Sequence, residues 1–416
     1  MVSWRAAYDS ILDRLSAVAS TARPTLCGLS ACVDATVSLH DAEALLEACG
    51  PPEALRFAEA LLQRVRAGIG GEMRVDWPDG PEWLDRRLSF TLALGGTAAH
   101  AARALATLGA PALLALETRS PEQLGVLHSG VWLAHEGRAV PAGAIQPDHP
   151  NAPRIYIFEY TKDRPIRDIV PARSSRIIVR FNDPGLENDP EFRALSQRLA
   201  PDAGAALLSG FNTIGAGDLA TALASSRELA SSWCMSKIPV IHLELGGYDR
   251  PQYRDRVLSE LSGPVTSLGL SLSELGALVS DHNLIGIDLA STMCVLGEEF
   301  GLRRICVHAD DWSATATLED PERERDALLM GNLLASSRAA HGRPILPTTI
   351  PADAVFETTP PLSPRSLGPW SIVVCATPYL AQPAATVGLG DTFTAGCLLM
   401  LGQNRRGRVP AVNYAS

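Results

Sequence analysis

Short apolar runs of β type alternate with longer helical patterns along most of the chain. The stretches Ala98–Leu108 and Leu284–Phe300, for example, have the pattern of helices. Continuous apolar strands separated by helices predict a mostly parallel sheet that is covered by helices on both faces. The runs expected to form strands are 26–29, 111–116, 205–210, 239–244, 265–268, 304–308 and 371–375.

Two regions interrupt this alternation. Residues 36–94 carry a helix rich in alanine, leucine and arginine and then a glycine-rich segment. Residues 129–175 hold short strand-like pieces such as 154–160. We predict that these two excursions, 36–94 and 129–175, form one small, β-rich lid. The remaining residues would form the core: 1–35, 95–128 and 176–416.

Composition excludes some classes of function. The chain has 416 residues, 46% of them hydrophobic, and a formal net charge of −10. A sizeable core can therefore form, and a general nucleic-acid binder is disfavoured. No apolar stretch reaches the roughly 20 residues of a membrane span, and the start lacks the apolar core of a signal peptide. We expect a cytoplasmic protein without nucleic-acid or membrane partners; its oligomeric state stays open, with a monomer favoured.

The eight cysteines are scattered, mostly within apolar runs, and form no Cys-x-x-Cys pair. This pattern favours buried free thiols over disulfides or a zinc site. Polar residues follow several of the expected strands, and ligands of parallel sheets bind beyond the carboxyl ends of the strands. The candidates for such a site are Asp34, Asn212, His242, Glu244, Ser271, Glu274, His308 and Asp391.

The most informative motif is Gly388-Leu389-Gly390-Asp391, which precedes an apolar run from Phe393 to Leu401. Two glycines two residues apart let backbone N–H groups point at one spot, and a helix starting here would aim its positive end at the same spot. A carboxylate repels bound phosphate, so Asp391 needs another task, and the natural one is to take a proton from an attacking hydroxyl. The motif suggests phosphoryl transfer to an alcohol, although Gly-x-Gly-Asp also occurs in ordinary turns.

Several segments in one order resemble a known family. They are 95–99, 154–160, 209–212, 242–244, 267–275, 307–308 and 386–396. Together they resemble the ADP-dependent glucokinase and phosphofructokinase family, from about Cys27 to about Leu401. The resemblance implies a ribokinase-like αβα core that binds the nucleotide, an inserted lid and ADP as the phosphoryl donor. It also implies Mg²⁺ or another divalent cation, and release of AMP.

The resemblance assigns roles at the reaction centre. Asp391 matches the catalytic base, and Gly388 and Gly390 match the cradle for the transferred phosphate. Arg176 matches an arginine near that phosphate, which a guanidinium can hold in a bidentate fork. The structural alternatives are a helix N-cap for Asp391 and a surface charge for Arg176.

The metal and nucleotide sites are also implied by the resemblance. Glu244 and Glu274 match two metal-related motifs, and Asp391 is counted with them. Magnesium prefers oxygen ligands and keeps several waters, so one or two carboxylates suffice, directly or through water. Without the resemblance these carboxylates would pass as exposed groups at strand ends. The expected nucleotide contacts are Ser271, His308, Ala309, Val387 and Gly390.

The sugar site is expected between core and lid. The resemblance implies that Asp34 holds sugar hydroxyls, since a carboxylate accepts two hydrogen bonds, and that Gly96 and Thr97 also bind the sugar. Glu72 matches the glutamate that members acting on unphosphorylated glucose place on the sugar, and a carboxylate there would repel a sugar phosphate. His149 is a candidate sugar contact from the lid. Asp34 as a turn residue and Glu72 as an exposed lid residue are the alternatives.

Four positions depart from the family pattern: Cys32, Thr97, Ser271 and Ala309. Cys32 and Thr97 replace amides that would contact a sugar, each worth roughly 0.5–1.5 kcal/mol. The other two alter the nucleotide side. We predict Mg²⁺-dependent phosphoryl transfer from ADP to a hexose such as glucose or to a hexose phosphate. A kinase of the same fold that uses ATP, or acts on a nucleoside or a specialised alcohol, remains an alternative, as does a non-catalytic ligand-binding relative.

Overall fold

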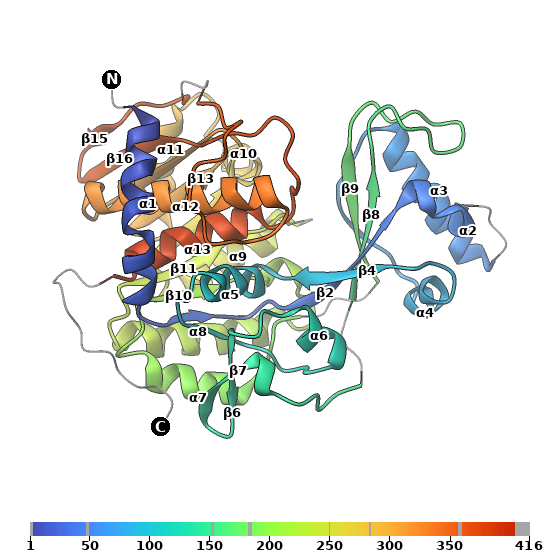
Figure 1. The fold of residues 1–416 in the computed structure, drawn as a ribbon, viewed down its shortest axis with the longest axis horizontal. Coiled ribbons are helices and arrows are strands. Elements are labelled where there is room, and N and C mark those ends of the chain that lie inside the picture. Colours follow the sequence, from blue (N-terminus) through green and yellow to red (C-terminus); the bar gives the residue numbers. More distant parts are fainter. Residues whose placement is uncertain are drawn as a thin grey trace.

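The protein is described from a computed structural model, which covers residues 3–46, 50–150, 154–181, 185–248, 250–282, 284–356 and 360–403. Figure 1 shows a large lobe and a small lobe, each built on its own sheet. Residues 32–38 lead directly from the large lobe into the small one, as strand β2 (Cys32–Ser38).

The large sheet contains every strand that the apolar runs predicted. Its order is β15 (Arg365–Leu367), β16 (Trp370–Ala376), β14 (Trp312–Thr317), β13 (Arg304–His308), β12 (Ser267–Ser271), β11 (Val240–Glu244), β10 (Ala205–Leu208), β1 (Thr25–Cys27), β5 (Ala112–Leu114), β6 (Trp132–His135) and β7 (Arg138–Pro141). Neighbouring strands from β13 to β6 are parallel, and the pairings outside them are antiparallel. The predicted mostly parallel sheet is confirmed.

Helices cover both faces of this sheet. One face packs against α1 (Trp4–Ser20), α5 (Thr97–Thr107), α12 (Pro321–His341) and α13 (Leu389–Leu401). The other packs against α7 (Pro190–Leu199), α8 (Leu219–Met235), α9 (Pro251–Leu261), α10 (Leu272–Asp281) and α11 (Leu289–Glu299). The predicted helix 284–300 begins later than expected, at Leu289, where the Asp288 side chain caps it.

Helix α13 lies deep in the large lobe, because its sequence of small and apolar residues allows burial on every side. It packs closely on α12, where Gly396 faces Gly331. A Cβ on Gly396 would lie 2.7 Å from the Cα of Gly331. This close packing fixes the position of the amino end of α13, which carries the glycine motif.

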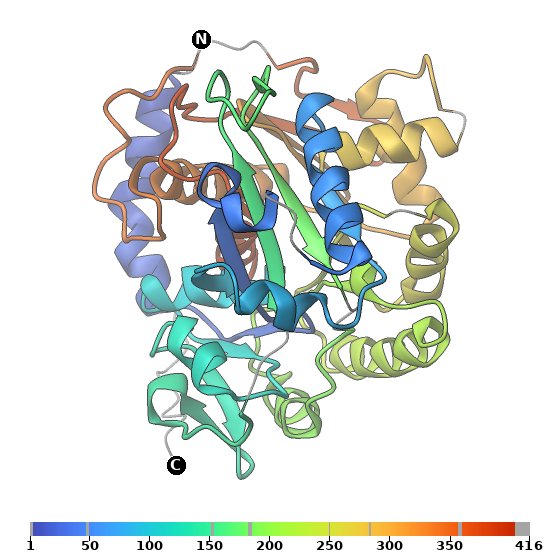
Figure 2. The ribbon, with the colours of Figure 1, turned by 90° about the vertical axis from the view of Figure 1, so that its right-hand side faces the viewer.

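The small sheet has the order β3 (Gly71–Arg74), β9 (Ser175–Arg180), β8 (Arg154–Tyr160), β2 and β4 (Thr91–Gly95). Helices α2 (Glu43–Leu46), α3 (Pro52–Arg66) and α4 (Gly80–Asp85) cover its outer face, and Figure 2 views the molecule from that side. Phe57 of α3 packs there against Phe158 and Phe181, with ring centroids 5.6 and 5.5 Å away. The inner face carries Ile155, Ile157 and other apolar residues, and faces the large lobe.

The sheets divide the chain differently from the boundaries that we expected. Strands β6 and β7 lie within 129–175 but pair with the large sheet, through Leu113 opposite Trp132. Strand β2, which we expected to begin in the core, and strand β9, which we expected to lie in the core except for Ser175, belong to the small sheet. The short helix α6 (Pro121–Val126) and the one-turn helices η1 (Leu39–Asp41), η2 (Ala142–Ala144) and η3 (Phe211–Thr213) occupy connections.

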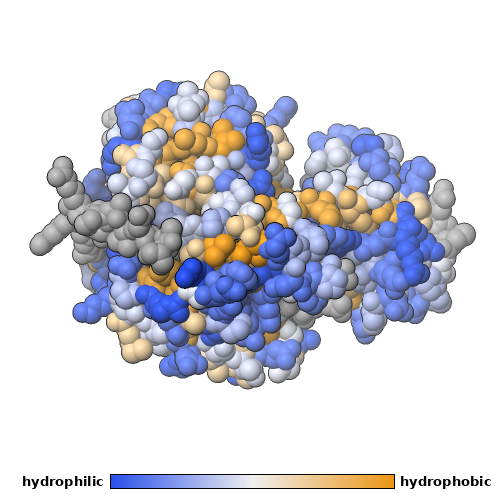
Figure 3. All heavy atoms as spheres, turned by 60° about the horizontal axis from the view of Figure 1, so that its bottom comes forward, coloured by the Kyte–Doolittle hydropathy of each residue, from blue (hydrophilic) through white to orange (hydrophobic). Residues whose placement is uncertain are grey.

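The surface and the thiols fit the composition. Hydrophilic residues cover most of the face seen in Figure 3, over both lobes. Among the described residues no helix combines the length and apolarity needed to cross a membrane. Seven cysteines are free thiols, all of them buried except Cys234, and the eighth, Cys49, lies outside the described residues.

Candidate active site

The glycine motif forms the amino end of α13. Gly388 is the N-cap residue in the left-handed conformation, with φ 72°, and Asp391 lies in the first helical turn. The Thr392 N–H makes the first bond of the helix, to the Gly388 carbonyl oxygen at 3.1 Å, and no side chain caps the end. The earlier N–H groups are therefore left for a ligand, and the helix dipole adds positive potential there.

Arg338 of α12 stabilises this turn by hydrogen bonds. Its guanidinium donates to the carbonyl oxygen of Gly388 and to Oγ1 of Thr392, both at 2.9 Å. A Cβ on Gly388 would collide with the guanidinium, so the glycine is required by space as well as by its φ. Burial raises the pKa of Asp391, while the Thr97 hydroxyl and the Arg338 charge act against that rise.

Glu244, at the end of β11, lies in a buried hydrogen-bond network. Its carboxylate accepts from Nε2 of His242 at 2.9 Å, Nε2 of His308 at 3.3 Å and Oγ1 of Thr394 at 2.9 Å. Burial alone would raise the pKa of Glu244, but the bonds from the two histidines outweigh burial and hold it well below its ordinary value. Burial alone would lower the pKa of His308, but Glu244 raises it to about 9. At neutral pH His308 is thus a cation paired with a carboxylate.

Glu274 forms a capping box at the start of α10. Its carboxylate accepts from the Ser271 N–H at 2.7 Å, and the Ser271 hydroxyl accepts from the Glu274 N–H at 3.3 Å. Burial raises the pKa of Glu274. Glu244, Glu274 and Asp391 all line one cavity, although the described residues hold no cluster of three or more His, Cys, Asp and Glu suited to a metal ion. Two carboxylates fit Mg²⁺ if waters and phosphate oxygens complete its ligands.

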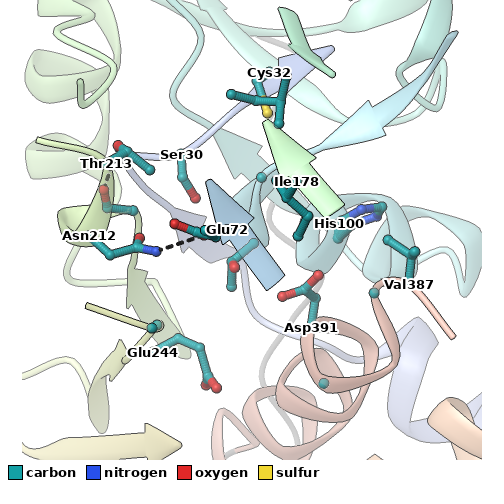
Figure 4. A pocket seen from close by; sticks show the side chains of 18 of the residues that line it. Ser30, Cys32, Glu72, His100, Ile178, Asn212, Thr213, Glu244, Val387 and Asp391 are labelled. Atoms are coloured by element: carbon teal, nitrogen blue, oxygen red, sulfur yellow. Dashed lines mark hydrogen bonds between the residues drawn. The ribbon is translucent and has the colours of Figure 1, made fainter. Parts of the chain in front are cut away.

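A cavity of about 390 Å³ separates the inner face of the small sheet from the large lobe. Asp34, Gly96 and Thr97 line it together with Asp391, and Figure 4 shows Asp391, Glu72 and Glu244 around one space. We expected Asp34 at the end of a core strand. It lies instead within β2 of the small sheet, because the chain crosses between the lobes before this residue. Burial raises the pKa of Asp34 to about 7.

Besides Asp34, the small lobe contributes three charged side chains to the cavity. Glu72 accepts from Nη2 of Arg180 at 2.6 Å and from Nδ2 of Asn212 at 3.3 Å. Nε and Nη1 of Arg180 are buried without a hydrogen-bond partner among the described residues. Arg176 donates to Oγ1 of Thr386 at 3.1 Å, just before the glycine motif. The charge of Glu72 is therefore offset by a guanidinium, which sequence reasoning did not foresee.

A second cavity, of about 660 Å³, adjoins the first. The two share four lining residues: His308, Thr386, Leu389 and Gly390. Apolar groups such as Leu272, Tyr379 and Phe393 make up much of the second cavity, and Ser271 and Ala309 line it too. A Cβ on Gly390 would lie 2.9 Å from Cε1 of His308, so the glycine leaves room between two residues that line both cavities.

The sequence matches a family model described as "ADP-specific Phosphofructokinase/Glucokinase conserved region" over residues 23–400. The chain belongs to this family. It is 24% identical to the ADP-specific phosphofructokinase of Pyrococcus abyssi over 83% of this chain and 86% of that protein. It is 21% identical to the ADP-dependent glucose/glucosamine kinase of Pyrococcus furiosus over 96% of this chain and 98% of that protein.

Solved structures share the fold. An ADP-dependent kinase in complex with fructose-6-phosphate and ADPβS superposes with a TM-score of 0.79 at 18% identity, over 98% of this chain and 100% of that chain. A hypothetical ADP-dependent phosphofructokinase from Pyrococcus horikoshii superposes with a TM-score of 0.76 at 19% identity, over 91% of this chain and 98% of that chain. The predicted α/β fold with a mostly parallel central sheet and the predicted family are both confirmed.

Most residues that the family resemblance singled out line one of the two cavities. The exception is His149, which lies in an exposed loop and lines neither of them. Along the chain, His149 lies between the β6–β7 hairpin of the large sheet and strand β8 of the small sheet, and its role as a sugar contact stays a prediction. Val387, which we expected to contact the nucleotide, lines the first cavity but not the second.

Sequence reasoning missed Arg338 and His100, which both lie beside the glycine turn. The sequence around Arg338 could have identified it as a candidate functional residue. It is a single arginine between small residues in the part of α12 that is buried, and an unpaired charge is costly there. His100 lies in an alanine-rich helix and carried no such signal.

Proposed function

We propose that this protein transfers a phosphoryl group from ADP to a hydroxyl of a sugar and releases AMP. One observation carries the proposal: Asp391 lies at the open amino end of α13, where the two cavities meet. The larger, more apolar cavity suits the base and ribose of a nucleotide. The smaller one, lined by carboxylates and arginines, suits a sugar. The names of the relatives in Pyrococcus agree with this assignment.

Asp391 acts as the general base. Burial raises its pKa, which brings a carboxylate closer to the basicity that proton abstraction at neutral pH requires. The free N–H groups at Gly388 to Gly390 and the Arg176 guanidinium, once it turns from Thr386, stabilise negative charge on the phosphoryl oxygens. His308 adds a positive charge where the cavities join.

Mg²⁺ is part of the proposal. Glu244, Glu274 and Asp391 are the residues that would hold the ion, directly or through water. When bound, the ion neutralises charge on the donor phosphates. His242 and His308 hold the Glu244 carboxylate ionised and in place for this task.

Two acceptors fit the cavity. Glu72 disfavours a sugar phosphate, whereas Arg180, with two buried N–H groups that lack partners, offsets that charge. We therefore keep glucose and fructose 6-phosphate as the two acceptors to be compared, with Asp34 as the residue that orients the sugar hydroxyls.

The test is release of AMP from ADP and Mg²⁺ in the presence of each acceptor, with ATP as the competing donor and nucleosides as competing acceptors. Turnover that requires a hexose or hexose phosphate, ADP and Mg²⁺ supports the proposal. Turnover with ATP but not ADP, or with a nucleoside but no sugar, overturns it in favour of another kinase of this fold. Binding of ligands without any product would show a non-catalytic relative.

A further inference from the structure

His100 is a cavity residue that the proposed reaction does not use. It lies on the first turns of α5, three residues after Thr97, and the two side chains therefore share one face of the helix. It lines the smaller cavity, where Figure 4 shows it near Asp391 and Val387. Its side chain is otherwise buried.

The contact with Arg338 fixes the protonation of the imidazole. Nδ1 of His100 lies 3.3 Å from Nη2 of Arg338. A guanidinium can only donate, so Nδ1 must accept, and the proton of the neutral ring is on Nε2. The doubly protonated ring is excluded at neutral pH, because burial first and the Arg338 charge second lower the pKa of His100 to about 3.

The Nε2–H group has no hydrogen-bond partner within the part of the chain that the structure describes. It also belongs to the acceptor side of the site, because His100 lines the smaller cavity and not the larger one. A neutral N–H donor held rigidly at such a place recognises an oxygen acceptor without adding charge.

We propose that His100 is a substrate-binding residue whose Nε2–H donates a hydrogen bond to an oxygen of the acceptor sugar, while Arg338 holds the ring in the required tautomer. This inference rests on the proposed function, since it takes the smaller cavity as the acceptor site. Arg338 thereby has two tasks: it supports the glycine turn and it orients a substrate contact.

Two isosteric variants separate substrate binding from support of Arg338. In His100→Asn the side-chain oxygen can still accept from Arg338 but the Nε2 donor is lost. In His100→Gln the amide nitrogen can replace Nε2. We expect His100→Asn to raise KM for the acceptor about three- to tenfold while KM for ADP stays within about twofold, and His100→Gln to raise KM for the acceptor less than His100→Asn does. His282→Asn, remote from both cavities, is the matched control.

Normal kinetics in His100→Asn, or a defect only in His100→Gln, would overturn the inference and leave the proposed function intact. Should the variants fail to fold, wild-type enzyme with ¹⁵N-labelled histidine tests the same point by NMR. A proton on Nε2 whose resonance moves with glucose or fructose 6-phosphate, but not with ADP alone, supports it. A proton on Nδ1, or no response to either sugar, refutes it. Absence of AMP release in wild type would instead refute the proposed function, and the inference with it.

Discussion

Asp391 is the residue on which the proposed reaction depends most directly. Asp391→Asn keeps the size of the side chain but cannot accept a proton. We expect kcat to fall about 100- to 10,000-fold, while KM for both substrates changes little. Burial raises the pKa of Asp391, so replacing this half-buried carboxylate by an amide also spares the fold a desolvation cost, and the variant should melt no lower than wild type. AMP release and a thermal melt measure both effects, and retained turnover would remove Asp391 from the mechanism.

The ionised carboxylate of Asp34 should lower the stability of the fold, although it is the form proposed to bind the sugar hydroxyls. Burial raises its pKa to about 7, above the roughly 3.9 of an unfolded chain. The folded state therefore binds the proton of Asp34 more tightly than the unfolded state does. The contribution of this proton to the free energy of unfolding is complete below pH 4 and is lost as the pH rises through 7. Three pKa units correspond to about 4 kcal/mol.

Asp34→Asn removes this ionisation. We expect the variant to be more stable than wild type by up to about 4 kcal/mol at pH 8, with a difference that fades toward pH 4. KM for the acceptor should rise, because a hydroxyl-binding carboxylate is lost. Urea unfolding at a series of pH values checks the first point. A stability difference that does not depend on pH would show that Asp34 titrates normally.

At the level of single residues, the sequence was informative where the signal is local. Gly388, Gly390 and Asp391 lie within one turn, and their chemistry can be read from four positions. The contact of Arg338 with His100 joins residues 238 positions apart, and no spacing rule connects them. Likewise, Glu72 looked like a free carboxylate until folding placed Arg180 beside it.

Among the elements, the amino end of α13 is the most constrained. Gly388 and Gly342 both have left-handed backbone, with φ 72° and 73°, but only at Gly388 would a Cβ collide with a neighbour, Arg338. Gly342→Ala should thus cost about 1–2 kcal/mol for its backbone alone. Gly388→Ala should cost about 1–3 kcal/mol more, and it should also lower kcat because the N–H groups of the turn move. If urea unfolding showed the same loss of stability for both variants, Arg338 would be able to move away from the added methyl group without strain.

Elements were predicted well where pattern and topology agree. Each expected apolar run forms a strand of the large sheet, because both faces of such strands are buried, although 371–375 forms β16 in its antiparallel part. The β6–β7 hairpin was placed in the wrong sheet, since a short strand pattern does not say which partner it will pair with. Strand β14 was missed, because Trp312–Thr317 alternates small and polar residues.

At the scale of the whole molecule, polar contacts join the two lobes across the cavity. Arg74 donates to the Asn212 carbonyl oxygen at 3.1 Å, Asn212 donates to Glu72, and Arg176 donates to Thr386. The sequence showed none of these pairs, because each joins residues more than 130 positions apart. They connect Arg74, Glu72 and Arg176 of the small lobe to the large lobe.

The contact between Arg176 and Thr386 allows the two tasks of this arginine to be separated. In Thr386→Val the guanidinium loses its partner in the large lobe but can still reach a phosphate. We expect kcat within about threefold of wild type, since a solvent-exposed hydrogen bond to a hydroxyl contributes little. In Arg176→Met the charge itself is lost, and kcat should fall about 100-fold, because the phosphoryl oxygens lose a cationic donor. Steady-state AMP release measures both variants. If Thr386→Val were as slow as Arg176→Met, the arginine would serve to hold the lobes together rather than to bind the transferred group.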